Sequence, residues 1–163
     1  MAGNEQRERA QIAEAAERIS ELVLETVEAT LAERSAEPGR RYLAGLSIGQ
    51  TDEERTTELM ITLIMVRWLS VIRDHVGDHV GTGDLVEPVL AWIREELGVR
   101  PAARARYTSA PLVSEETAAD IMGYRDALHS DFLPSMAWLL AAAVALHGEG
   151  KTDWLRELVG RSG

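Results

Sequence analysis

The chain of 163 residues contains no cysteine and only one lysine, Lys151. The lack of cysteine excludes disulfide bonds, zinc sites made of thiolates and cysteine nucleophiles. The sequence also lacks a Gly-x-Ser-x-Gly segment, so the sharp turn that presents a serine nucleophile is not indicated. Its N-terminal segment is highly charged and has no apolar core of a secretory signal. We therefore expect a cytoplasmic protein.

Positive charge is scarce. Seventeen Lys and Arg residues stand against 27 Asp and Glu residues, which gives a net charge of −10 at pH 7. This charge repels polyanions, so we expect no binding to nucleic acid and no attraction to anionic membranes. A neutral or cationic partner protein fits this composition better.

One long apolar run stands out, from Phe132 to Leu146, and only Pro134 and Ser135 interrupt it. A helix of this length spans about 22 Å at 1.5 Å per residue, whereas a bilayer core is roughly 30 Å thick. The run therefore predicts a helix buried by other helices of a soluble protein rather than a membrane span.

A second helix is predicted to be apolar on nearly all sides, from Leu59 to Ile72. It follows a capping box, in which the side chains of Thr51 and Glu54 each accept a hydrogen bond from a backbone N–H at the helix start. We expect this helix to pack centrally against the Phe132–Leu146 helix. Apolar surface left over by these two helices would be covered most simply in a symmetric homodimer.

Amphipathic patterns predict the remaining helices. They cover about residues 5–34, 84–97, 114–129 and a short segment from 152, and the first ten residues are expected to fray. Residues 38–50 are expected to form a loop. Residues 99–113 are expected to form an exposed basic loop, because they hold Arg100, Arg104 and Arg106 and no acidic residue. The fold class is therefore all-α, one domain over residues 1–163, in a helical bundle of five or six helices.

The clearest candidate for metal chemistry is the pair His75 and His79, which lie four residues apart on a helix. With His129 and Asp131 they would make a ligand set for zinc, iron or manganese. The simpler interpretation needs no metal, because histidines are favourable at the negative end of a helix dipole. A metal-dependent helical enzyme is therefore an alternative hypothesis, and the main one includes no cofactor.

The main functional hypothesis is a non-catalytic acidic protein that acts through protein contacts, as an adaptor, an immunity or antitoxin-like partner, or an accessory subunit. Two surfaces of opposite charge would steer a partner protein. They are the acidic ridge, Glu14, Glu21, Glu25 and Glu28, and the basic residues Arg100, Arg104 and Arg106. A second alternative is a pocket for an apolar small molecule, lined by Met60, Trp68, Trp138 and Leu139.

Overall fold

The computed structural model describes residues 2–80 and 84–161, with only the backbone described at residues 2, 78–80 and 161. The described residues form helices and no strand, which confirms the all-α class. Seven α-helices have seven or more residues, one more than the six expected. They are α1 (Ala2–Glu33), α2 (Glu37–Leu43), α3 (Asp52–Val80), α4 (Val86–Glu96), α5 (Val99–Ala105), α8 (Phe132–His147) and α9 (Thr152–Arg161).

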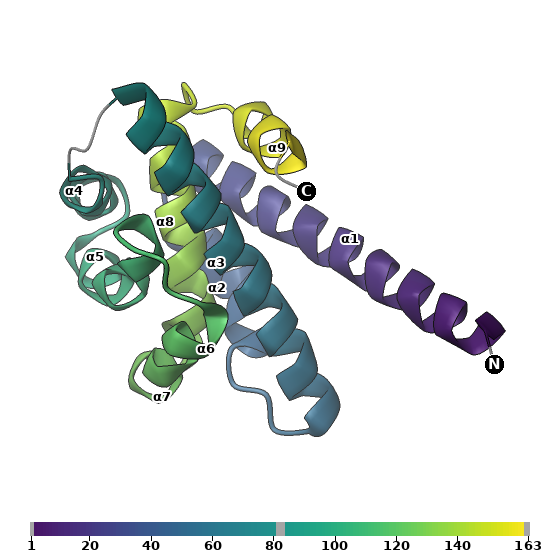
Figure 1. The fold of residues 1–163 in the computed structure, drawn as a ribbon. Helices are drawn as coiled ribbons and strands as arrows, with labels where there is room; N and C mark the ends of the chain where they lie inside the picture. The colour runs from purple at the N-terminus through teal and green to yellow at the C-terminus, as the bar shows by residue number, and fades with distance from the viewer. Residues whose placement is uncertain (1, 81–83, 162–163) are drawn as a thin grey trace.

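Helix α8 lies at the centre of the bundle and packs against α1, α3, α4 and α5 (Figure 1). Every residue from Phe132 to Val144 is buried. The one hydroxyl in this stretch is satisfied, because Ser135 Oγ donates to Phe132 O at 2.7 Å and shares a 2.9 Å hydrogen bond with Thr108 Oγ1. The predicted central pairing of this helix with α3 is confirmed.

The apolar stretch that includes α8 is buried within the chain. The segment Ala118–His147 is long and apolar enough to cross a membrane by length and composition, yet 83% of its most apolar window is buried inside the fold. This is how the core helix of a soluble protein behaves. Because helices of the same chain already bury α8, no second chain is needed to cover it, and the homodimer stays a prediction.

Helix α3 begins with the predicted capping box. Glu54 N donates to Thr51 Oγ1 at 3.1 Å, and Thr51 N donates to Glu54 Oε1 at 3.2 Å. The helix continues beyond Ile72, the last residue of the predicted apolar helix, through Gly77 to Val80. It runs in the same direction as α8, because its first turns lie near α6 (Ala118–Ile121) and α7 (Arg125–Leu128) and its last turns near α9 (Figure 1).

Two expected loops are partly helical. Within residues 38–50, Pro38 lies in the first turn of α2, and a short 3-10 helix, Ala44–Leu46, follows. Within residues 99–113, α5 is followed by the 3-10 helices Arg106–Thr108 and Ala110–Leu112. The prediction of an exposed basic loop over residues 99–113 is therefore wrong, because one side of this segment packs into the core. Its buried residues include Pro101, Ala102, Ala105, Thr108, Pro111 and Leu112.

The single helix expected over residues 114–129 is instead broken. Only α6 (Ala118–Ile121) and α7 (Arg125–Leu128) are α-helical, with a 3-10 turn, Met122–Tyr124, between them. Thr117, not Ser114, caps α6, and it forms a capping box with Asp120. A positive φ of 52° at His129 then ends α7 and redirects the chain into α8.

A buried ion pair connects the start of α3 to α7. Glu58 is fully buried, and its carboxylate accepts hydrogen bonds from Arg125 Nε and, at 2.9 Å, from the backbone N–H of Gly49. Arg125 Nη2 also donates to Gly49 O at 3.2 Å. These bonds hold the segment before α3 against α7.

Candidate functional site

The acidic ridge lies on the side of α1 that faces away from the core. Residues Ile19, Val23 and Val27 point into the bundle, and Glu14, Glu21, Glu25 and Glu28 are exposed. The N-terminal half of α1 extends beyond the other helices (Figure 1). Residues 2–10, which were expected to fray, are part of this continuous helix, and the described side chains among them are exposed.

A shallow groove of about 380 Å³ runs along this ridge. Its walls are acidic apart from one arginine and one leucine, and none of the described residues forms an ion pair with Glu14 or Glu25. The groove is lined by Glu14, Glu17, Arg18, Glu21, Leu22 and Glu25. Such a surface attracts a cationic segment of another molecule.

Helix α9 neutralises part of the ridge. Arg156 Nη1 donates to Glu21 Oε1 at 2.7 Å, and this hydrogen bond holds the pKa of Glu21 below its usual value. A second groove, of about 440 Å³, lies between the end of α1 and the start of α9, where Glu28 faces Lys151 and Arg156. Glu28 forms no ion pair with a described residue but lies near these basic side chains, so Glu14 and Glu25 are the ridge carboxylates that have no basic residue of this second groove beside them.

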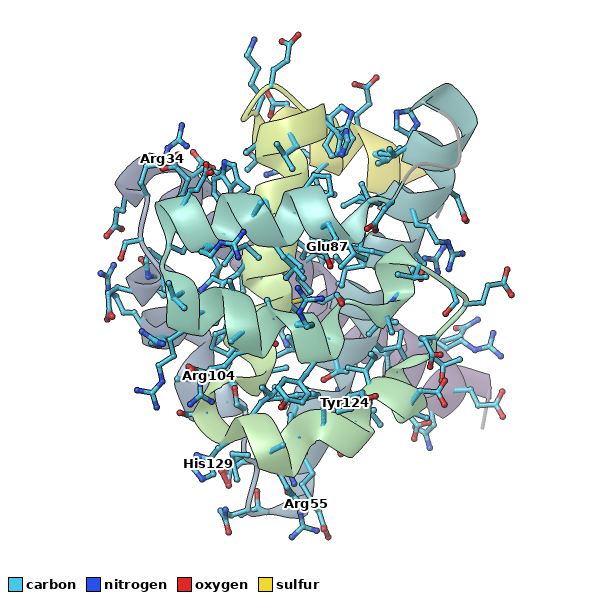
Figure 2. All side chains as sticks on the ribbon, turned by 90° about the vertical axis from the view of Figure 1, so that its left-hand side faces the viewer. Arg34, Arg55, Glu87, Arg104, Tyr124 and His129 are labelled. Carbon is cyan, nitrogen blue, oxygen red and sulfur yellow. The ribbon has the colours of Figure 1, made fainter. Side chains whose placement is uncertain are left out.

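The basic residues do not form a free patch. Arg106 Nη1 lies 3.0 Å from Glu87 Oε1, and Arg104 Nε lies 3.2 Å from Asp131 Oδ2, a close ion pair without hydrogen-bond alignment. Arg100 is exposed. Figure 2 shows Arg104 and Glu87 on the face made by α4 and α5, and this face lies across the bundle from α1 (Figure 1). Two of the three expected positive charges are thus neutralised within the chain.

The structure does not bring the four proposed metal ligands together. His75 packs edge-on against Trp154 near the C-terminal end of α8, with ring centroids 6.0 Å apart. His129 and Asp131 precede the N-terminal end of the same helix, which is about 24 Å long at 1.5 Å per residue. The side chain of His79 is outside the described residues. Within the described part of the chain, no group of three or more His, Asp or Glu side chains could hold a metal ion.

Asp131 has a structural role that the sequence did not reveal. It is nearly buried, and Arg40 donates to both of its oxygens, from Nε at 3.1 Å and from Nη2 at 3.4 Å. The guanidinium of Arg40 also lies 5.3 Å from the ring centroid of Trp138. Asp131 precedes α8 without a side-chain cap, because its carboxylate binds Arg40 and Arg104 instead.

The tryptophans and apolar residues proposed to line a small-molecule pocket are mostly core. Trp138 and Leu139 are fully buried, and Trp68 is 6% exposed. Trp138 Nε1 donates to Ala36 O at 3.2 Å, which fixes the segment between α1 and α2 on α8. Met60 instead lines a surface groove with residues of α1.

No family model, curated protein or solved structure matches this chain. The candidate site is therefore chosen from the surface of this chain alone, and it is the acidic face of α1.

Proposed function

We propose that this chain is a non-catalytic, cytoplasmic protein that binds a partner protein through the acidic ridge of α1. The observation that carries the proposal is the row of exposed carboxylates on a helix whose N-terminal half extends beyond the bundle. The chain's net charge of −10 adds a field of the same sign. The partner surface that fits is rich in lysine and arginine, as expected for a target of an adaptor, an antitoxin-like protein or an accessory subunit.

Electrostatic attraction of this kind acts mainly on the rate of association and on the choice of partner. It also weakens with ionic strength, because salt screens exposed charges over about 8 Å at physiological concentration. Binding through the ridge should therefore fall steeply as salt is added. Contacts at apolar surface would respond much less to salt.

The test reverses Glu14 and Glu25, two ridge charges that form no ion pair with a described residue. In the variant Glu14→Lys with Glu25→Lys, capture of the native partner from a cell lysate should fall strongly. The matched control is Glu95→Lys with Glu115→Lys, which changes the net charge equally at two exposed acids outside α1. Equal capture by both variants and the wild type would contradict a role for the ridge.

A further inference from the structure

An apolar groove lies where the N-terminal half of α1 diverges from the first turns of α3. Ile12 and Ala15 of α1 and Met60 of α3 form its apolar lining, and Glu8 and Gln11 complete it, around a volume of about 260 Å³. We call it the α1–α3 groove. Helix α9 contacts the later turns of both α1 and α3, whereas the N-terminal half of α1 runs away from the first turns of α3 (Figure 1).

Large apolar side chains are unusually exposed at this groove. Ile12 is 62% exposed, and Leu59 and Leu63 on the outer side of α3 are 43% and 54% exposed. Leu59 and Leu63 do not line the groove, but Leu63 lies about one helical turn after Met60, so exposed apolar side chains continue from the groove onto the outside of α3. A contiguous exposed surface of this kind indicates a binding site.

Negative charges outnumber positive ones near the groove, where Arg7 and Arg9 stand on either side of Glu8 in α1 and Arg55 lies in the first turn of α3. Glu8 lines it directly, and the ridge groove, with Glu14 and Glu17, is the next hollow along α1. The first turn of α3 adds Asp52, Glu53 and Glu54. A second copy of this chain would bring its own charge of −10 to the contact and would be repelled. Charge complementarity therefore favours a different, basic partner.

We propose that the α1–α3 groove binds an amphipathic helix of a partner protein, with apolar residues seated on Ile12, Met60 and Leu63 and flanking lysines or arginines facing Glu8 and Glu14. Amphipathic helices bind apolar grooves through side chains at i, i+3, i+4 and i+7. The part of α1 from Glu8 to Arg18, before the first buried residue, is roughly 15 Å long, which accommodates about three turns of such a helix. This inference rests on the proposed function and specifies the partner.

The binding test uses two fluorescein-labelled synthetic peptides of equal charge. The first is a lysine-flanked helix with leucines at i, i+4 and i+7, and in the second each leucine is serine. Fluorescence anisotropy should show the wild-type chain binding the first peptide at least about tenfold more tightly than the second, because only the first can bury apolar surface. Equal affinity for the two peptides would overturn the role of the groove.

Variants of the chain locate the binding site. Ile12→Ser with Leu63→Ser should weaken binding of the leucine peptide by about tenfold or more. The matched control is Val99→Ser with Val113→Ser, which removes valines that are 72% and 67% exposed elsewhere. Circular dichroism should show all variants folded, since each change is at an exposed position. Equal loss of affinity in both variants would refute binding at the groove.

Two further results separate this proposal from the one on which it rests. If Glu14→Lys with Glu25→Lys abolishes peptide binding while the groove variant binds normally, the acidic ridge stands and the groove proposal fails. If the groove variant alone loses binding, the groove stands and the ridge proposal fails. Light scattering that shows a wild-type dimer, and a monomer for Ile12→Ser with Leu63→Ser, would identify a second copy as the occupant and overturn the inference.

Discussion

Replacing Arg125 with methionine tests the buried ion pair that joins α3 to α7. Glu58 is fully buried, and its carboxylate accepts hydrogen bonds from Arg125 Nε and from Gly49 N. Methionine keeps most of the apolar volume of the arginine stem but removes its charge. The variant therefore leaves a buried carboxylate without its cation, which is far more costly than losing an exposed ion pair.

The expected loss of folding stability follows from the burial of Glu58 and from the hydrogen bonds it keeps. Removing one partner of a buried ion pair destabilises a protein by about 3–5 kcal/mol. Gly49 N still donates to Glu58 in the variant, and the Arg125 side chain is 22% exposed, so we expect the lower end, about 3 kcal/mol. At roughly 2–4 °C per kcal/mol for a chain of this size, the unfolding temperature should fall by about 6–12 °C.

Unfolding by urea and by heat is monitored by circular dichroism. The double variant Glu58→Gln with Arg125→Met should be more stable than Arg125→Met alone, because it contains no unpaired buried charge. The control Arg106→Met removes an ion pair whose two side chains are 60% and 59% exposed, and its unfolding midpoint should stay close to that of the wild type. The reasoning is refuted if Arg125→Met unfolds like the control, or if the double variant is less stable than the single one.

Three further changes test the packing around α8. In Gly39→Ala the new Cβ would lie 2.8 Å from Trp138 Nε1, so urea unfolding should show a loss of about 1–3 kcal/mol. In Gly148→Ala the Cβ would lie 2.6 Å from Trp154, so α9 should be displaced and limited proteolysis should cleave it faster. Burial and the nearby charge of His75 hold the pKa of His147 below 6.5. The folded state therefore binds fewer protons than the unfolded chain, and stability should fall as the pH drops from about 7.5 to about 5, less so in His147→Gln.

Local patterns in the sequence were sufficient to predict the two central helices. The uninterrupted apolar run correctly predicted α8, and the Thr51–Glu54 capping box correctly predicted the start of α3. The loops predicted over residues 38–50 and 99–113 each contain an early proline that turns out to be helical. Pro38 and Pro101 each lie in the first turn of a short helix, where the missing N–H of proline has no intrahelical partner to lose.

The side-chain contacts that define the surfaces could not be predicted in this way. Arg40 and Asp131 are 91 residues apart, and Arg156 and Glu21 are 135 apart, so no local periodicity reports that they meet. These pairings neutralise charges that composition alone counted as free. The acidic ridge itself was predictable, because the 3.6-residue period fixes which side of α1 faces away from its buried residues.

The burial of α8 from Phe132 to Val144 makes side-chain volume, rather than polarity alone, the constraint on the sequence of this stretch. Ala137, Ala141, Ala142 and Ala143 are each 0% exposed, and neighbouring helices meet this rod on every side. Small side chains there allow those neighbours to approach closely, so a larger apolar residue would push them apart. Natural variation along this helix should consequently exchange residues of similar size.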